Sequence, residues 1–302
     1  TGGAGFIGSN FLHYLHKVTD EKVVVLDSLT YAANEKYIPD HCEFIWCDIR
    51  NEAHVNYLFN KHRPKKVFHF AAESHVDRSI GNSNPFISTN INGTINLLNA
   101  SLAVEVEKFH HISTDEVYGS LDYDDTELFT EKTPYDPRNP YSATKASAEH
   151  FVTSWYNTYG LPYLITSSSN NYGVGQHEEK LIPKVVTNAL NDKITYMHDG
   201  GEQIRDWIHV QDHCDAIWTL DKQNVLNDKF NIGGSCELQN IEVTKKILDL
   251  LDKPYSLIGV SHDRPGVDKR YGTDFSKLTE RTGWVPQIKF DEGLQETVNF
   301  YK

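Results

Sequence analysis

Three glycines at the start of the chain restrict its fold more than any other feature. Gly2, Gly5 and Gly8 form the pattern G-x-x-G-x-x-G within the opening residues TGGAGFIGSN. This spacing suits a tight turn from a strand into a helix, where side chains would block the close approach of a pyrophosphate. Such a turn needs a preceding strand, and the sequence begins at Thr1 without one. We therefore expect that the chain as given lacks its first strand.

Strand-like and helix-like segments alternate after this turn. Apolar strand patterns occur at residues 22–27, 44–49, 66–72, 108–113 and 162–169, and helical patterns occur between them at 6–18, 52–62, 85–102 and 141–159. The alternation predicts an α/β fold with a Rossmann-type doubly wound parallel sheet. From about residue 171 the sequence changes to loops, short helices and scattered strands. We expect residues 1–170 to bind a dinucleotide, with about 204–229 returning to that domain, and 171–302 to form mainly a smaller mixed α/β substrate lobe.

Asp27 is the expected acidic partner of the glycine turn. It closes a predicted strand about twenty residues after the turn, where a carboxylate accepts hydrogen bonds from both hydroxyls of an adenosine ribose. The same carboxylate repels a phosphate on the 2′ oxygen, so NAD is favoured over NADP. The alternative is an ordinary turn residue at a strand end. Asp48, at the end of the next strand, is placed either to face the adenine edge or to lie in a solvated loop.

Tyr141 and Lys145 form a second candidate constellation. They lie four residues apart in NPYSATKASAE, at the start of a predicted helix, and so share one helical face. An ammonium beside a phenol favours the phenolate and lowers the pKa of Tyr141, which suits it to act as the base in the oxidation of an alcohol. An isolated Y-x-x-x-K pair is more often a surface helix. Its place after a dinucleotide-binding fold favours the catalytic interpretation.

The segment HHISTDEVYGS places two adjacent carboxylates at the end of a predicted strand. Thr114, Asp115 and Glu116 lie at the carboxyl edge of the sheet, where folds of this type bind ligands. Neighbouring carboxyls in a partly dry cleft separate their pKa values, so that one of them stays protonated. The pair is therefore suited to acid and base chemistry. The alternative is a solvated junction between a strand and a loop.

Together these segments resemble the extended short-chain dehydrogenase/reductases, and within them the nucleotide-sugar 4,6-dehydratases. The resemblance covers essentially the whole chain, through TGGAGFIGS, LDSLTYAAN, HFAAESHVDRSI, HHISTDEVYG, NPYSATKASAEH, SSNNYG, EKLIP, QIRDWIHVQDH, FNIGG and DRPGVDKRY. TDEVYG is the segment that best separates the 4,6-dehydratases from their relatives. Related sugar epimerases share the glycine turn and the Y-x-x-x-K pair but lack the Asp-Glu pair, and decarboxylating relatives carry only the Glu.

The resemblance implies a reaction in three stages on a nucleoside-diphosphate glucose. NAD takes a hydride from carbon 4 while Tyr141, helped by Lys145, removes the hydroxyl proton. Glu116 then takes the proton of carbon 5, and Asp115, kept protonated, donates to the departing hydroxyl of carbon 6. Return of the hydride to carbon 6 and of a proton to carbon 5 gives a 4-keto-6-deoxy sugar. Thr114 hydrogen-bonds the carbon 4 oxygen.

The resemblance also implies binding residues. We expect NAD to contact Gly2, Gly5, Phe6, Ile7, Gly8, Asp27, Asp48, Ile49, Ala71, Ala72, Tyr141 and Lys145. We expect the nucleotide sugar to contact Ser74, His75, Asn170, Asn171, Lys180, Leu181, Arg205, Asn240, Arg264 and Tyr271. His75 is equally suited to a structural role, and an ion pair with Asp206 is the alternative for Arg205. Two arginines suit a diphosphate, because guanidinium binds phosphate oxygens in a fork. We expect no metal site.

The identity of the nucleotide stays open between thymidine and uridine. The segment GVGQHEEK stands where the family has a proline-bearing loop that shapes the nucleotide pocket. The two bases differ by one methyl group, which is worth about 1–3 kcal/mol of discrimination. The expected substrate is therefore dTDP-glucose or UDP-glucose, and the product can lead to rhamnose or to other deoxysugars. A 4-epimerase and a catalytically silent NAD-binding protein are the alternative functions.

Composition restricts the partners and the location. Lys and Arg total 29 against 42 Asp and Glu, a formal charge of −13, which argues against nucleic acid as a partner. No apolar span approaches the roughly eighteen residues of a transmembrane helix. The four cysteines form no C-x-x-C pair, so neither a zinc site nor a disulfide framework is indicated, and we expect a cytoplasmic protein. The resemblance implies a homodimer formed through the helices at 85–102 and 141–159.

Overall fold

The main sheet of the protein is parallel. The computed structural model describes residues 1–261 and 265–302, so that Arg264, an expected substrate contact, lies outside the described residues. The main sheet has the order β3-β4-β5-β9, formed by β3 (Lys66–His69), β4 (Lys108–Thr114), β5 (Tyr163–Ser168) and β9 (Asp228–Ile232). All of its neighbouring strands are parallel. Because parallel strands need crossover connections, this sheet requires the alternating helices that the sequence predicts.

A parallel pair, β1 (Val24–Asp27) and β2 (Glu43–Trp46), carries the glycine turn's acidic partner. The first residues of the chain link this pair to the main sheet. The backbone N–H of Gly2 donates to the carbonyl of Leu26 at the end of β1 (2.9 Å), and the N–H of Phe70 after β3 donates to the carbonyl of Thr1 (3.0 Å). The glycine turn therefore lies between β1 and β3.

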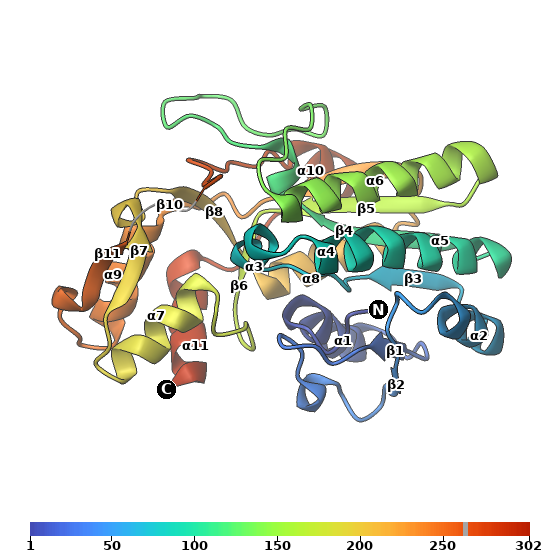
Figure 1. Cartoon of the computed structure of the whole chain (residues 1–302), viewed down its shortest axis with the longest axis horizontal. Coiled ribbons are helices and arrows are strands. Elements are labelled where there is room, and N and C mark those ends of the chain that lie inside the picture. Colours follow the sequence, from blue (N-terminus) through green and yellow to red (C-terminus); the bar gives the residue numbers. More distant parts are fainter. Residues whose placement is uncertain (262–264) are drawn as a thin grey trace.

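Helices cover both faces of this α/β core (Figure 1). They are α1 (Phe6–Val18), α2 (Glu52–His62), α3 (Val76–Gly81), α4 (Asn84–Phe86), α5 (Thr94–Ala103), α6 (Pro140–Tyr159), α8 (Val210–Lys222) and α10 (Ser276–Thr282). Short helical turns are η1 (Glu35–Tyr37), η3 (Asp115–Tyr118), η4 (Asp199–Gly201) and η5 (Tyr255–Leu257). The helix predicted over 52–62 has those bounds, and the one predicted over 141–159 begins one residue earlier, at Pro140.

The helix predicted over 85–102 is not continuous. A π-helical turn, η2 (Ile87–Gly93), separates α4 from α5. The side chain of Asn90 in this turn accepts a hydrogen bond from the Glu73 N–H (2.8 Å) and donates to the Glu73 carbonyl (3.0 Å) and to Thr144 Oγ1 (3.0 Å). These hydrogen bonds stabilise the wider helical turn at η2. The apolar periodicity of the sequence does not indicate such a turn. The turn thereby ties the segment after β3 to α6.

The second half of the chain builds smaller sheets. One has the order β10-β8-β6, from β10 (Glu237–Gln239), β8 (Ile204–His209) and β6 (Asn170–Tyr172), and the other pairs β7 (Thr195–His198) with β11 (Ile258–Ser261). α7 (Leu181–Leu190), α9 (Asn240–Leu250) and α11 (Phe290–Tyr301) gather beside them at one end of the molecule (Figure 1). Within residues 204–229, β8 belongs to this smaller sheet, whereas α8 packs on α1 and the chain then enters β9 of the main sheet.

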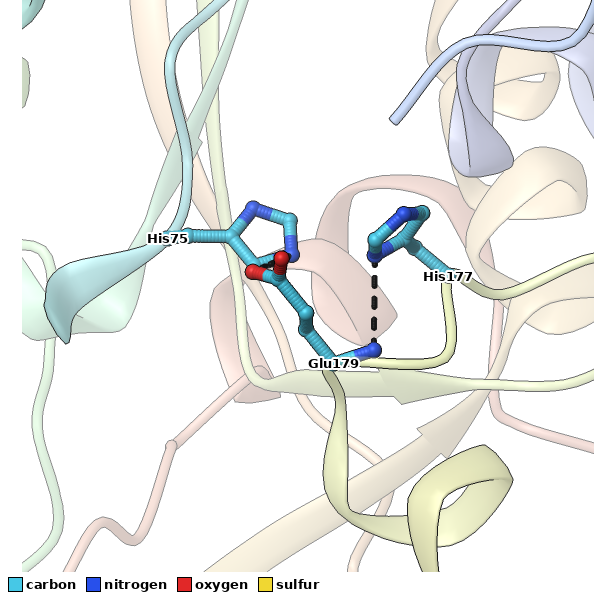
Figure 2. A group of neighbouring side chains, drawn as sticks. All are labelled: His75, His177 and Glu179. Carbon is cyan, nitrogen blue, oxygen red and sulfur yellow. Dashed lines mark hydrogen bonds and ion pairs between the residues drawn. The ribbon is translucent and has the colours of Figure 1, made fainter. Parts of the chain in front are cut away.

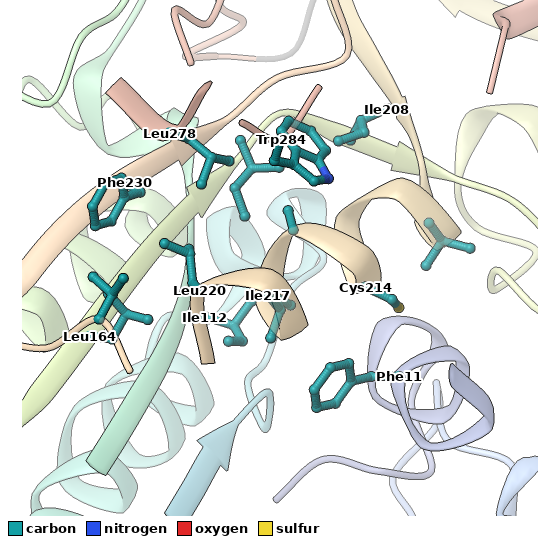
Figure 3. Packing of buried hydrophobic residues seen from close by; sticks show 14 of the residues in the cluster. Phe11, Ile112, Leu164, Ile208, Cys214, Ile217, Leu220, Phe230, Leu278 and Trp284 are labelled. Carbon is teal, nitrogen blue, oxygen red and sulfur yellow. The ribbon is translucent and has the colours of Figure 1, made fainter. Parts of the chain in front are cut away.

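A buried apolar cluster joins the main sheet to its helices (Figure 3). Phe11 of α1, Ile112 of β4, Leu164 of β5, Ile217 of α8 and Leu278 of α10 belong to it. Burying a side chain of this size stabilises the fold by about 1.5–3 kcal/mol. The cluster therefore fixes α1, and the glycine turn that precedes it, against β4, the strand that ends at Thr114.

Two properties predicted from composition can be compared with the structure. Within residues 1–261 and 265–302, no helix is long and apolar enough to cross a membrane. All four cysteines have free thiols, with Cys47 and Cys214 buried.

Candidate active site

One cavity of about 290 Å³ collects most of the residues predicted to act. It runs from the glycine turn past the ends of β1 and β4 to β6. All of the expected cofactor contacts line it: Gly2, Gly5, Phe6, Ile7, Gly8, Asp27, Asp48, Ile49, Ala71, Ala72, Tyr141 and Lys145. So do Thr114, Asp115 and Glu116, and the expected substrate contacts Ser74, His75, Asn170, Asn171 and Lys180. The residues expected to contact the dinucleotide and many of those expected to contact the sugar nucleotide therefore line one continuous cavity.

The glycine turn is packed too closely for side chains at Gly2 and Gly8. Gly2 has φ +76°, and a Cβ on Gly8 would lie 2.1 Å from the carbonyl oxygen of Gly2. Gly5 is the N-cap of α1 and supplies no side-chain hydrogen bond to the helix. The first turn of α1 therefore offers its backbone N–H groups to the cavity, as a helix N-terminus does when it binds a pyrophosphate. The turn fits a dinucleotide.

Asp27 is held in place by the backbone around it. Its Oδ2 accepts a hydrogen bond from the N–H of Ala4 (2.9 Å) and its Oδ1 accepts one from the N–H of Leu29 (2.8 Å). Each carboxylate oxygen keeps a further lone pair for a ribose hydroxyl. Asp48 is engaged differently, since its Oδ1 accepts from Nε of Arg50 (2.9 Å). Arg50 also lines the cavity, and Asp48 neutralises it. The free acceptor positions of Asp27 fit the ribose hydroxyls of NAD.

We expect Asp27→Asn to weaken NAD binding by about tenfold and to reduce the preference for NAD over NADP. The substitution removes a charged acceptor, and hydrogen bonds to charged groups contribute about 1.5–3 kcal/mol. Titration of cofactor-free protein with each dinucleotide measures both effects. Asp20→Asn, at an exposed position outside the cavity lining, is the matched control. An unchanged NAD to NADP ratio in Asp27→Asn would contradict this assignment.

Thr114 and Asp115 are fixed where β4 passes into η3. Thr114 Oγ1 accepts a hydrogen bond from the N–H of Glu116 (3.3 Å) and so caps the turn. The Thr114 hydroxyl also lies 3.5 Å from Asp115 Oδ1, and the hydroxyl of Thr273 donates to Asp115 Oδ2 (3.1 Å). The Glu116 carboxylate accepts from Nδ2 of Asn139 (3.5 Å). Both oxygens of Asp115 are therefore oriented by hydroxyl groups.

Burial favours the protonated, acid form of Asp115. Only 1% of it is exposed, and burial raises its pKa well above the ordinary value, with smaller contributions from the Glu116 and Asp206 carboxylates. Asp206 is itself buried beneath the backbone N–H groups of Gly234 (3.0 Å) and Cys236 (2.9 Å), and burial raises its pKa to about 6. Sequence analysis identified Asp115 but missed Asp206 and Thr273.

Tyr141 and Lys145 are buried at the start of α6. Asn139 caps this helix in a capping box and Pro140 occupies its first turn. Nζ of Lys145 donates to the carbonyl of Ile112 (2.7 Å) and lies 3.4 Å from Nε2 of His111. Burial lowers the pKa of Lys145 to about 8. The shared helical face predicted from the sequence thus points at the end of β4.

The predicted direction of the Tyr141 pKa shift is wrong for this structure. Burial raises the pKa of Tyr141, the negative charge of Glu116 raises it further, and a hydrogen bond from Thr114 acts in the opposite sense. Lys145 is engaged with the main chain of β4. Desolvation therefore decides the direction of the shift, and the sequence pattern does not reveal how deeply the phenol is buried.

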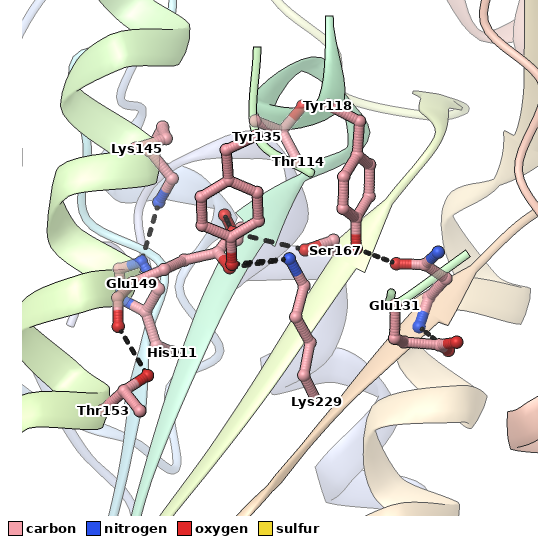
Figure 4. A network of polar contacts seen from close by, with 12 residues as sticks. His111, Thr114, Tyr118, Glu131, Tyr135, Lys145, Glu149, Thr153, Ser167 and Lys229 are labelled. Atoms are coloured by element: carbon pink, nitrogen blue, oxygen red, sulfur yellow. Dashed lines mark hydrogen bonds and ion pairs between the residues drawn. The ribbon is translucent and has the colours of Figure 1, made fainter. Parts of the chain in front are cut away.

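A buried polar network lies between α6 and the strands of the main sheet (Figure 4). Glu149, one helical turn after Lys145, accepts hydrogen bonds from the hydroxyls of Ser113 and Tyr135. It also pairs with Nζ of Lys229 on β9 (2.7 Å). The network joins α6 to β4 and β9, and the charge of Glu149 raises the pKa of Lys145 against the effect of burial. No local sequence signal pointed to these partners.

His75, His177 and Glu179 converge at the edge of the cavity (Figure 2). Their potential ligand atoms lie within 4.8 Å of one another. The carboxylate of Glu179 is ion-paired with Arg78, and Lys180 nearby helps burial to lower the pKa of His75 to about 3. The Arg78 guanidinium therefore already occupies the carboxylate ligand, and the charge of Lys180 disfavours a further cation beside His75. Its contacts join the segment after β6 to the segment after β3.

Several expected substrate contacts lie elsewhere. Of the described residues, Leu181, Arg205, Asn240 and Tyr271 do not line the cavity. The guanidinium of Arg205 stacks 4.2 Å from the centre of the Tyr271 ring and donates to the carbonyls of Ile204 (2.7 Å) and Asp268 (3.0 Å). Its charge nevertheless lowers the pKa of Asp115, so the pair lies close to the acid. The alternative of an ion pair with Asp206 is not what these contacts show, because Asp206 binds backbone N–H groups.

The chain matches a family model and several known proteins along nearly its whole length. The model described as GDP-mannose 4,6 dehydratase matches residues 1–297. A protein of Haemophilus influenzae named dTDP-glucose 4,6-dehydratase is 44% identical over 326 residues, which span 100% of this chain and 96% of that protein.

Solved structures share the fold. DesIV, a dTDP-glucose 4,6-dehydratase from Streptomyces venezuelae solved with NAD bound, is 39% identical with a TM-score of 0.95, covering 99% of this chain and 95% of its own. A UDP-glucose 4-epimerase of Thermus thermophilus, solved with NAD, is 28% identical with a TM-score of 0.92, covering 99% of this chain and 97% of its own. Both dehydratases and epimerases therefore share this architecture.

Proposed function

The chain belongs to the GDP-mannose 4,6 dehydratase family, and we propose that it catalyses the NAD-dependent 4,6-dehydration of dTDP-glucose. The product is the 4-keto-6-deoxy sugar nucleotide, and the enzyme is a hydro-lyase. Relatives that are 44% identical carry this name, and a 39% identical structure with it contains NAD. The single observation that carries the proposal is a buried Asp115, whose pKa is raised, beside Glu116 in the same cavity as Tyr141 and the glycine turn.

Each catalytic side chain has a role in this proposal. The chemistry that NAD supplies when bound is removal of a hydride from carbon 4 and its return to carbon 6. Tyr141 takes the proton of the carbon 4 hydroxyl, and Thr114 orients that oxygen. Glu116 takes the proton of carbon 5 and later returns it, while Asp115 protonates the departing hydroxyl of carbon 6. Elimination needs an acid and a base together, which a pair with separated pKa values provides.

A 4-epimerase is the nearest alternative. The epimerase fold superposes almost as well as the dehydratase fold, so architecture does not separate the two. Epimerisation needs no acid at carbon 6. The cost of burying Asp115 with only hydroxyl partners at its two oxygens is explained by the elimination step and is unexplained in an epimerase. The same burial argues against a silent NAD-binding protein.

The remaining expectations stay predictions. We propose that residues 1–170 bind NAD and that 171–302 contribute mainly to binding the nucleotide sugar. A homodimer through the helices near 85–102 and α6, and a cytoplasmic location, complete the proposal. Size-exclusion chromatography with light scattering tests the dimer.

The deciding experiment follows product mass. Purified protein is incubated separately with dTDP-glucose, UDP-glucose and GDP-mannose. We expect dTDP-glucose to lose one water with no net NADH formed, faster than the other two. Conversion of a glucose nucleotide to its galactose isomer at unchanged mass would replace this proposal with epimerisation, and NAD binding without turnover would favour the silent protein.

A further inference from the structure

After each turnover of the proposed reaction, Tyr141 and Asp115 differ in protonation from their states at its start. Tyr141 gains the proton of the carbon 4 hydroxyl, and Asp115 loses a proton to the departing water. Glu116 takes one proton from carbon 5 and gives one back to carbon 5, so its own proton count is unchanged, and the hydride returns to the sugar. The enzyme therefore ends with a protonated Tyr141 and an ionised Asp115. The next turnover requires one proton to leave the phenol and one to reach the carboxylate.

The structure places one hydroxyl between these two groups. Thr114 hydrogen-bonds Tyr141 and also lies 3.5 Å from Oδ1 of Asp115. Its oxygen accepts from the N–H of Glu116, which fixes the side chain at the end of β4. A hydroxyl donates one hydrogen bond and accepts two, so Thr114 can receive a proton from one neighbour as it passes its own to the other.

Resting on the proposed function, we propose that Thr114 returns the proton from Tyr141 to Asp115 between turnovers. The O–H bond of the Tyr141 phenol breaks as a new O–H bond forms on Thr114 Oγ1. The original O–H bond of Thr114 breaks as one forms on Asp115 Oδ1. No electron, cofactor or solvent molecule is consumed. The transfer restores a phenolate base and a carboxylic acid together.

The surroundings favour an internal route. Asp115, Thr114 and Tyr141 are each less than a tenth exposed, so that exchange with bulk water is slow. Burial and two neighbouring carboxylates, Glu116 and Asp206, make the ionised form of Asp115 a strong proton acceptor. Burial and the charge of Glu116 raise the pKa of Tyr141 and so hold its proton. The positive charge of NAD, when it is bound in the cavity that Tyr141 lines, lowers the pKa of the phenol and favours release of that proton.

A competing route ends on the other oxygen of Asp115. Thr273 donates to Asp115 Oδ2 (3.1 Å), and Thr273 and Asp206 both line a second cavity on that side. A proton from solvent could reach Asp115 through this cavity. Thr273 therefore provides a matched control, because it is also a threonine bonded to Asp115 but has no contact with Tyr141 among those described.

The test compares the first turnover with later ones in rapid-quench experiments on the NAD-loaded enzyme with excess dTDP-glucose. We expect Thr114→Val to show a product burst of about one per active site, followed by turnovers about 10²-fold slower than the first. Thr114→Ser should restore later turnovers. A small diffusible weak acid together with its conjugate base, such as imidazolium with imidazole, can supply a proton to Asp115 and accept one from Tyr141. It should accelerate the slow phase of Thr114→Val and leave its burst unchanged, an effect that loss of substrate orientation alone would not produce.

The outcomes separate the inference from the function on which it rests. If Thr114→Val slows first and later turnovers equally and the weak acid has no effect, the internal route is wrong. A burst in Thr273→Val instead would assign the return of the proton to the second cavity. Wild-type enzyme that releases no water from dTDP-glucose even in the first turnover would contradict the dehydratase function itself.

Discussion

Asp115→Asn is expected to stop water elimination and to spare the first oxidation. An amide has the size of the carboxylic acid and can keep the contact with Thr273, but it cannot deliver a proton to the hydroxyl on carbon 6. General acid catalysis contributes about 10²–10⁴-fold, so overall turnover should fall by about that factor. Mixing the NAD-loaded variant with dTDP-glucose should give a rise in the absorbance of reduced nicotinamide that persists, with no sugar nucleotide that has lost water.

Two comparisons make this result specific. Glu116→Gln should also block dehydration, but it alone should abolish exchange of the carbon 5 hydrogen with D₂O, because Glu116 is the proposed base. Asp122→Asn changes an exposed carboxylate paired with Lys269 and should behave as wild type. Dehydration at the wild-type rate in Asp115→Asn would remove this residue from the mechanism.

The raised pKa of Asp115 also gives a pH dependence. The acid form is the active one, so kcat should be retained below its raised pKa and fall as the pH increases through it. Burial alone is the largest cause of the shift. Asp206→Asn removes the charge of a neighbouring carboxylate and should lower the pKa of Asp115. The fall in kcat should then occur at lower pH, but the pKa should stay above its ordinary value because burial remains. An alkaline limb that stays in place would separate it from Asp115.

Much of the fold was predictable because local rules and tertiary structure agree here. The apolar run at residues 23–26 favours a buried parallel strand, and β1 is buried at three of its four positions. The glycine turn followed by Asp27 predicts both a cofactor and the edge of the sheet at which it binds. Strand ends then place Asp115 and Tyr141 together, since the carboxyl ends of parallel strands share one edge.

The parts that could not be predicted depend on residues distant in the sequence. Thr273 is separated from Asp115 by 158 positions, and no local pattern links them. Lys229 pairs with Glu149 across 80 positions, although each residue alone resembles a surface charge. The degree of burial of Tyr141 reverses the predicted direction of its pKa shift. Residue type and spacing predict which groups meet, but the solvation of those groups depends on the packed tertiary structure.

Tyr141→Phe is expected to abolish the oxidation itself, before any water is lost. The phenyl ring keeps the packing against Phe86, whose ring centre lies 6.4 Å away, so the fold should be retained. Without the phenol oxygen there is no base for the carbon 4 hydroxyl, and the rate of nicotinamide reduction should fall by about 10²–10⁴-fold. Stopped-flow measurement of reduced nicotinamide in a single turnover tests this directly.

The contrast with the acid variant gives the sharper test. Tyr141→Phe should show no transient reduced nicotinamide, whereas Asp115→Asn should accumulate it. The double variant Tyr141→Phe/Asp115→Asn should therefore accumulate no reduced nicotinamide, because oxidation precedes elimination. Tyr57→Phe, at an exposed position of α2, is the control for loss of a phenol oxygen. If the double variant still accumulated reduced nicotinamide, some other group would be the base for the first step, and the position of Tyr141 beside Thr114 would need a different explanation.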